Sequence, residues 1–142
     1  MDYEAWEASM SPCVRSDPLW RMSAYRLGEY VADEAYPDVV MLERRRITRK
    51  AAEQLFSALG SIPVNLAEGY SRSSGLDRVR FFEYALGSAR ESRSWYLRCR
   101  AVLGQQVVDA RIELLARIIS LLLVAIPSER QRAIRKSSPP GS

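Results

Sequence analysis

The sequence of 142 residues contains no histidine. Because histidine is the usual general base, its absence excludes Ser–His and Cys–His nucleophile systems and most zinc motifs. The seven glycines are isolated from one another, so the sequence has no glycine-rich phosphate loop. We therefore expect a protein that is not an enzyme and that has no catalytic residue, no cofactor and no metal ion.

Cysteines and long apolar runs are also scarce. Cys13 and Cys99 form no CxxC motif, and the acidic stretch MDYEAWEASM at the start does not resemble a secretory signal. The longest apolar run, residues 118–127, has ten residues, whereas a membrane helix needs about 20. These features predict a protein of the reducing cytoplasm without a membrane span.

Lysine is scarce as well, because nineteen of the 21 basic residues are arginine. Residues 1–42 contain eight acidic and three basic residues, a net charge of −5, and residues 43–142 contain nine acidic and eighteen basic residues, a net charge of +9. The planar guanidinium group suits phosphate and carboxylate recognition, but a GC-rich genome would produce the same bias. Composition alone therefore leaves both explanations open.

Apolar residues recur at intervals of three and four, and no segment alternates as a strand would. Since short connections join the helical segments, the pattern predicts an all-α protein, an antiparallel up-and-down four-helix bundle. Pro37 is expected to end the first helix and Gly69, as a left-handed residue, the second. The predicted helices span residues 18–35, 39–69, 75–103 and 105–126, within one domain of residues 18–126.

The segments outside this domain have a different composition. Residues 1–17 have no sustained apolar period and are expected to form a flexible N-terminal arm. Residues 127–142 are expected to form a basic tail rich in proline and serine. Between residues 118 and 126 the last helix is apolar on nearly every side, which is typical of a helix buried on more than one side. We therefore expect contacts between subunits of a homo-oligomer.

The stretch SIPVNLAEGYSRSSG, residues 61–75, places a proline inside the second predicted helix. Proline removes a helical hydrogen bond and kinks the helix. Our hypothesis is that small residues of the third helix approach this kink closely. Polar residues beside the proline would bond the freed backbone group and partners such as Ser88 or Arg80. This structural motif comprises Pro63, Asn65, Glu68, Gly69, Gly87 and Ser88.

The strongest functional candidate is ERRRITRK, residues 43–50. Its basic residues are Arg44, Arg45, Arg46, Arg49 and Lys50. On a helix they would spread over about 240°, so one or two would have to face a neighbouring helix. The sequence leaves three interpretations open: a solvated, salt-bridged helix entrance, a phosphate-binding site, or a subunit interface. Further candidate nucleic-acid-binding residues lie at the opposite end of the second predicted helix: Arg72, Arg78 and Arg80.

Two motifs carry a family resemblance: SIPVNLAEGYSR, residues 61–72, and RFFEYALGSARE, residues 80–91, followed by Leu103 and Gly104. They resemble the bacterial four-helix-bundle family of 23S ribosomal RNA intervening-sequence proteins, related to the accessory variability determinant proteins of diversity-generating retroelements. The resemblance implies a homopentameric, non-enzymatic bundle with a basic surface. The chain departs from the family at Phe56-Ser57, where members commonly have basic residues.

These features together predict a non-enzymatic, nucleic-acid-binding accessory protein whose partner is RNA or DNA. The resemblance adds a retroelement reverse transcriptase as a candidate partner. The alternative is a protein-interaction scaffold with no nucleic-acid role, in which the last helix and the acidic residues 1–42 carry the contacts. A third, weaker alternative is a Mg²⁺-dependent nuclease built from Glu68, Glu83 and Glu91.

Overall fold

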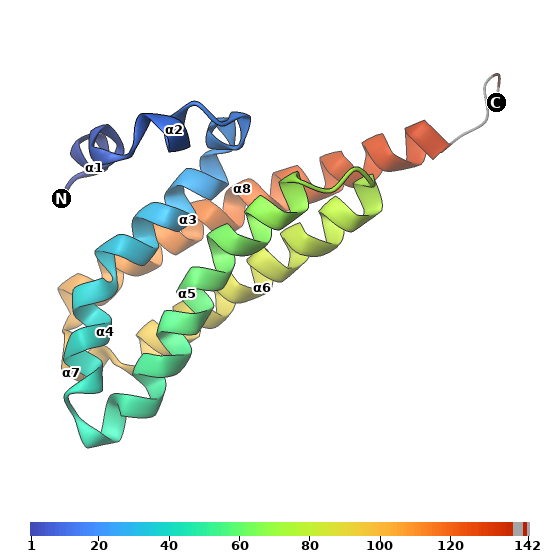
Figure 1. Ribbon diagram of the computed structural model, residues 1–142. Helices are drawn as coiled ribbons and strands as arrows, with labels where there is room; N and C mark the ends of the chain where they lie inside the picture. The colour runs from blue at the N-terminus through green and yellow to red at the C-terminus, as the bar shows by residue number, and fades with distance from the viewer. Residues whose placement is uncertain (138–140, 142) are drawn as a thin grey trace.

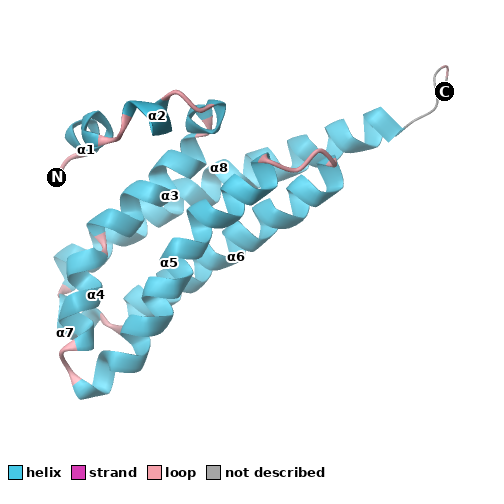
Figure 2. Cartoon of the chain, viewed as in Figure 1, coloured by secondary structure: helices cyan, strands magenta, loops and turns pink. Residues whose placement is uncertain are grey.

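The computed structural model describes residues 1–137 and 141, and it is all-α, as predicted. Figure 2 shows helices joined by short loops and no strand in the described part of the chain. The longer helices are α3 (Ser23–Glu34), α4 (Tyr36–Glu43), α5 (Arg49–Tyr70), α6 (Gly75–Arg98) and α8 (Gln105–Ser137). The short ones are α1 (Tyr3–Ser9), α2 (Pro12–Arg15), α7 (Arg100–Leu103) and two 3₁₀ turns, Pro18–Arg21 and Arg46–Thr48. Within the described residues, no helix is both long and apolar enough to cross a membrane.

The long helices surround one apolar core (Figure 1). α5 packs along α6, α6 packs along α8, and α3 contacts both α5 and α8. Each contributes the apolar stripe that its periodicity predicts, since residues three and four apart share a helix face. The largest fully buried side chains include Leu55, Ile62, Leu66, Phe82, Tyr96, Leu115, Ile118 and Leu122.

The chain between α3 and α5 differs from the prediction. Pro37 does not end the first helical segment, because it lies in the first turn of α4, where no helical N–H is needed. α4 continues roughly in line with α3 as far as Glu43, and α5 begins at Arg49 (Figure 1). The prediction of one helix over residues 39–69 is therefore wrong: residues 39–43 are helical but belong to α4, and residues 44–48 form the turn before α5. Ile47, which lies four residues before Ala51 and so shares the apolar spacing of the predicted helix, is 90% exposed.

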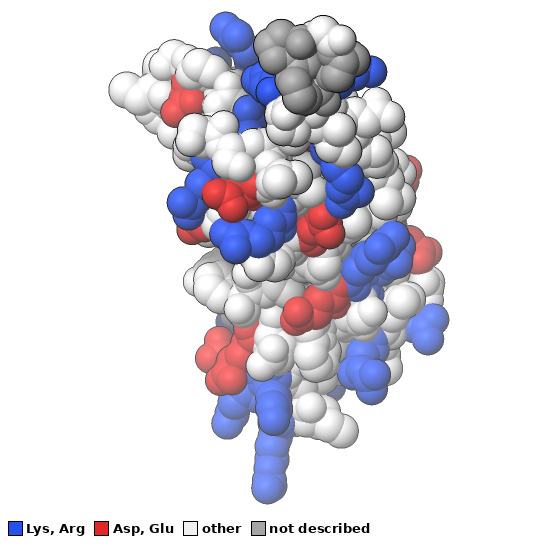
Figure 3. Space-filling model, turned by 90° about the vertical axis from the view of Figure 1, so that its right-hand side faces the viewer, with Lys and Arg blue, Asp and Glu red and all other residues white. Residues whose placement is uncertain are grey.

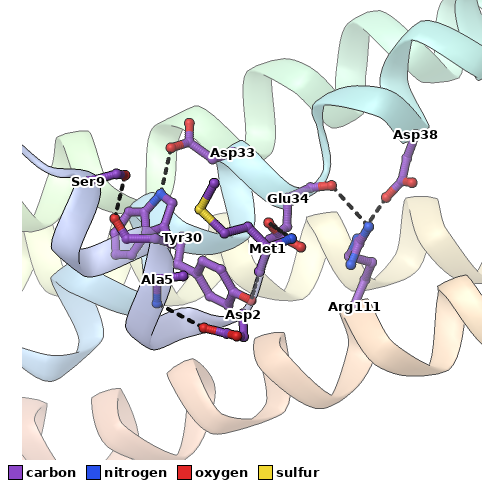
Figure 4. A network of polar contacts seen from close by, with 10 residues as sticks. Met1, Asp2, Ala5, Ser9, Tyr30, Asp33, Glu34, Asp38 and Arg111 are labelled. Atoms are coloured by element: carbon purple, nitrogen blue, oxygen red, sulfur yellow. Dashed lines mark hydrogen bonds and ion pairs between the residues drawn. The ribbon is translucent and has the colours of Figure 1, made fainter.

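The first 17 residues contain structure that their weak periodicity did not predict. α1 packs its Trp6 ring on Trp20, with ring centroids 5.9 Å apart, and the Trp6 indole N–H donates a hydrogen bond to Asp33 at 2.7 Å. The Tyr30 hydroxyl donates to the Met1 carbonyl oxygen at 2.8 Å (Figure 4). A second, aromatic cluster thus attaches the N-terminal segment to α3.

The proline of α5 is buried, but the contacts around it differ from our hypothesis. A Cβ on Gly28 would lie 3.1 Å from Ile62 Cγ2 and 3.4 Å from Pro63 Cδ, so the close neighbour is α3. Gly87, predicted to make this approach, is exposed and has nothing near its Cβ position. The prediction of a close approach by the third helix is wrong, because α6 turns this residue to solvent.

The predicted polar contacts of the motif are also absent among the described residues. Asn65 Nδ2 donates to the Ser61 carbonyl oxygen, one turn earlier, at 2.8 Å. Glu68 is exposed, and the Ser88 carbonyl oxygen accepts from the Ser92 hydroxyl at 2.8 Å. The asparagine therefore supports its own helix next to the proline and does not bridge to α6.

The glycines at two helix ends behave differently. Gly69 is helical, and α5 continues to Tyr70, so the predicted left-handed end is wrong. A Cβ on Gly69 would lie 2.9 Å from both Phe81 and Phe82, so the absence of a side chain lets α6 pack tightly there. Gly104 has a φ of 89° and separates α7 from α8, as its predicted role as a helix breaker requires.

The last helix is longer than predicted. α8 passes Pro127 and reaches Ser137, so most of the predicted tail of residues 127–142 is helical. Residues 138–140 and 142 of that tail lie outside the described residues. The extension runs past the loop between α5 and α6 (Figure 1), and its sequence contains Arg130, Arg132, Arg135 and Lys136.

Candidate nucleic-acid interface

The turn between α4 and α5 presents the predicted basic cluster at one end of the molecule. Thr48 holds this turn: its hydroxyl donates to the Leu42 carbonyl oxygen at 2.6 Å, and its amide donates to the Arg45 carbonyl oxygen at 3.1 Å. Arg45 has an extended backbone, so the cluster does not lie on a continuous helix. The α4–α5 patch, as we name it, comprises Arg44, Arg45, Arg46, Arg49 and Lys50.

All five side chains of the α4–α5 patch are exposed. The prediction that one or two would face a neighbouring helix is wrong, because the turn replaces the helix on which it was based. None of the five forms an ion pair with a carboxylate of the described residues. The interpretation as a salt-bridged helix entrance is therefore also wrong. A solvated surface, a phosphate-binding site and a subunit interface remain.

The structure adds two arginines that sequence reasoning missed. Arg98 and Arg100 are exposed and lie where α6 ends and α7 begins. α7 packs against α4, which brings these residues to the same end as the α4–α5 patch. The antiparallel arrangement of helices was the signal that could have found them. In Figure 3 basic side chains extend from the lower end, where the α4–α5 turn lies in Figure 1.

Arg72, Arg78 and Arg80 lie at the other end of α5, whose 22 residues span about 33 Å. The structure therefore does not join them to the α4–α5 patch. The guanidinium carbons of Arg72 and Arg80 lie 4.9 and 5.2 Å from the centre of the Phe81 ring. Arg80 also pairs with Asp77 at 3.6 Å. These cations already have partners within the protein.

The extension of α8 brings further basic residues to this second end. Arg130 pairs with Glu83 at 2.7 Å, and Arg132 pairs with Glu129 at 3.3 Å. Arg78 of α6 contacts the same Glu129 carboxylate at 3.5 Å. Figure 3 faces this end and shows acidic side chains among the basic ones. The second end thus mixes both signs of charge.

The glutamates of the nuclease alternative have other surroundings. Glu83 pairs with Arg130, and Glu91 accepts a hydrogen bond from the Trp95 indole N–H at 3.1 Å. Within the part of the chain that the structure describes, no three histidine, cysteine, aspartate or glutamate side chains are arranged to hold a metal ion. Nothing in the geometry therefore supports the nuclease alternative.

A buried polar cluster joins α4, α6 and α8, and the sequence did not reveal it. Arg111 Nε donates to Asp38 Oδ2 at 2.8 Å, and its Nη2 donates to the Glu34 carbonyl oxygen at 2.9 Å (Figure 4). The Tyr96 hydroxyl also donates to Asp38 Oδ2, at 2.7 Å. Burial, together with the nearby Asp38 charge, raises the pKa of Tyr96. Burial lowers the pKa of Arg111, but the hydrogen bond and charge of Asp38, together with the nearby Tyr96 and Glu34, outweigh this and leave the pKa raised. The polar groups of the Asp38–Arg111–Tyr96 cluster bond to one another, so the cluster serves the fold.

The sequence matches the family model described as 23S rRNA-intervening sequence protein over residues 25–131. This span covers α4, α5, α6 and α7, most of α3 and α8, and the α4–α5 patch. It excludes α1, α2 and the last residues of α8. No curated protein and no solved structure matches the chain.

Proposed function

The chain belongs to the 23S rRNA-intervening sequence protein family, and we propose that it is a non-enzymatic, cytoplasmic RNA-binding protein. The family name suggests a role associated with ribosomal RNA. The observation that carries the proposal is the α4–α5 patch, with five exposed basic side chains and no ion pair to a carboxylate of the described residues. Unpaired cations are available to neutralise phosphates and release counterions.

The proposed recognition is of charge and shape, not of base sequence. Proteins that read RNA sequence usually stack unpaired bases on exposed aromatic rings. Ile47, the most exposed apolar side chain of the α4–α5 turn, has no ring for stacking. The exposed rings of Tyr36 and Phe56 lie on α4 and α5, in an apolar group that we assign below to contacts between copies. Tyr84 is 51% exposed but lies on α6, and Tyr70 is half-buried with the Arg78 guanidinium 5.6 Å from its ring centre. Structured RNA is thus the preferred partner.

We further propose that the chain is a four-helix bundle and that copies assemble into a homopentameric ring. In this arrangement α3 and α4 together form the first of the four helices of the bundle, and α5, α6 and α8 form the other three. A ring uses two different faces of each copy. Two separate groups of exposed apolar side chains support this proposal: Leu121, Leu123 and Val124 on α8, and Tyr36, Phe56 and Val64 on α4 and α5.

A ring would repeat the α4–α5 patch once per copy and so strengthen RNA binding through several weak contacts. A retroelement reverse transcriptase remains the candidate protein partner, proposed from the family resemblance. The ring is tested by light scattering of the purified protein, with the Leu121→Glu/Val124→Glu variant alongside. We expect a mass well above the 16.1 kDa of one chain for the wild type and a smaller mass for the variant. A wild-type monomer at micromolar concentration would contradict the ring.

RNA binding is tested by fluorescence anisotropy with a structured RNA and a DNA duplex between about 50 and 300 mM salt. The test variant replaces all five residues of the α4–α5 patch by alanine. The control variant removes the same charge from five exposed arginines elsewhere: Arg15, Arg21, Arg90, Arg117 and Arg135. We expect steeply salt-dependent binding that the test variant loses and the control variant largely keeps. No binding at the lowest salt would favour the protein-interaction scaffold instead.

A further inference from the structure

The end of the molecule opposite the α4–α5 patch contains a cavity of about 340 Å³. It lies between the N-terminus of α6 and the last turns of α8. Its polar lining includes Ser73, Ser74, Arg78, Glu129, Arg132 and Lys136. The proposed RNA site leaves this cavity unexplained.

Close packing of α6 and α8 builds the cavity. A Cβ on Gly75 would lie 2.7 Å from the Ala133 Cβ, so the first turn of α6 rests directly on α8. Ser74 caps α6: its hydroxyl accepts from the Asp77 amide at 3.5 Å, and its carbonyl oxygen accepts from the Arg78 amide at 3.0 Å. The first N–H groups of a helix have no partner within it, and the helix dipole makes this end positive.

The positive and negative charges that line the cavity do not cancel. Arg78 and Arg132 both pair with the single carboxylate of Glu129, at 3.5 and 3.3 Å. Lys136 is exposed and forms no ion pair within the described residues. Three cations and one anion line the cavity, so their net charge is +2. Arg78 Nε is also buried and has no hydrogen-bond partner among the residues that the structure describes, so Glu129 does not saturate this guanidinium group.

We propose that this cavity binds a terminal phosphomonoester group, carried by the end of an RNA strand or by a free nucleotide. A phosphomonoester has a charge of about −1.5 to −2 at pH 7 and three strong acceptor oxygens. This charge matches the net +2 of the lining, whereas an internal phosphodiester carries one negative charge. Guanidinium groups and the N–H groups at a helix start are the donors that such oxygens prefer. The inference deepens the proposed function, because RNA is one source of the phosphate.

The test compares two RNAs of one sequence, with a 5′-phosphate and with a 5′-hydroxyl, in anisotropy titrations at fixed salt. We expect the 5′-phosphate to strengthen binding about tenfold, the effect of one or two charge-assisted hydrogen bonds. The Arg132→Ala/Lys136→Ala variant should lose this difference and keep its affinity for the 5′-hydroxyl RNA. The matched control, Arg130→Ala/Arg135→Ala, changes residues of the same helix that do not line the cavity and should keep the difference.

Calorimetry with AMP and adenosine distinguishes a free nucleotide from an RNA end as the source of the phosphate. It also tests the cavity when the protein binds no RNA. Binding of AMP but not of adenosine, lost in Arg132→Ala/Lys136→Ala, supports the cavity even if no RNA binds. Preference for the 5′-phosphate RNA without AMP binding assigns the cavity to RNA ends. Equal affinity for the two RNAs together with no AMP binding would overturn the proposal. If neither RNA binds, the absence of AMP binding alone would overturn it.

Discussion

The two ends of the molecule are both rich in arginine, but their arginines are in different states. At the α4–α5 patch the guanidinium groups are exposed and have no carboxylate partner among the described residues. At the opposite end Arg78, Arg80, Arg130 and Arg132 pair with carboxylates, and of these Arg78 and Arg132 line the cavity. An unpaired cation attracts any phosphate, whereas paired cations around a cavity select a ligand by its shape and charge. Pairing, more than the number of arginines, distinguishes the two ends.

Arg111 extends this comparison to a third state, a half-buried guanidinium group paired with a buried carboxylate, and its substitution has the largest expected effect. Arg111→Met leaves Asp38 buried without its cation, and breaking a buried pair from one side costs about 3–5 kcal/mol. We expect the free energy of unfolding, measured in urea, to fall by about this amount. Asp38→Asn/Arg111→Met should recover part of the loss, because it leaves no uncompensated charge. A single variant as stable as wild type would show that the Asp38–Arg111–Tyr96 cluster contributes little.

The comparison between the two ends is tested next by alanine variants in RNA-binding titrations. Removing the five cations of the α4–α5 patch should reduce the slope of log K against log salt by about 3.5–4.5, at 0.7–0.9 for each phosphate contact. Arg72→Ala/Arg80→Ala should change the slope by less than one contact, because Phe81 and Asp77 already engage these cations. If each cation removed reduced the slope of log K against log salt equally at both ends, the distinction between unpaired and paired arginines would be contradicted.

The smallest expected effect concerns the acidic residues 1–42, where removal of a charge should stabilise the protein. Burial, and the nearby Asp33 charge, raise the pKa of Glu29. A raised pKa in the folded state means that stability present below the unfolded pKa is lost as the pH rises through the folded pKa. Glu29→Gln should therefore melt a few degrees higher than wild type near pH 7, and the difference should vanish below about pH 4. A wild type that melts higher at pH 7 would contradict this expectation.

Much of the fold could be predicted from the sequence because the apolar stripes of the long helices face one core. The errors occurred where local rules have exceptions. Pro37 fits the first turn of a helix as well as it ends one, and Ile47 has the spacing of a core residue by coincidence. Gly69 makes room for Phe81 and Phe82 of α6, a contact that a rule about helix ends does not consider. A tertiary contact therefore decided the conformation of Gly69, whereas Pro37 and Ile47 follow from where α4 begins and ends.

The two candidate sites also differ in how far the sequence predicts them. The α4–α5 patch was visible in the sequence, because its cations are consecutive and remain exposed. The cavity was not, since it depends on the continuation of α8 past Pro127 and on the contact of Gly75 with Ala133. Arg98 and Arg100 could have been found from the predicted antiparallel arrangement, which places the end of α6 near the start of α5. Clustered charge is thus readable from sequence, while a site assembled from distant helices is not.

The Asp38–Arg111 pair also bears on the order in which the chain folds. The loop that joins α5 to α6 is short, so the ends of this hairpin meet early, whereas Asp38 and Arg111 are 73 residues apart. Closing long loops costs entropy before their contacts form, and local contacts accordingly favour fast folding. We expect α5 and α6 to form the folding nucleus and α4 to dock on α8 late. Substitution of Arg111 would then mainly speed unfolding, while substitution of Leu66 would slow folding, a contrast that stopped-flow kinetics can measure.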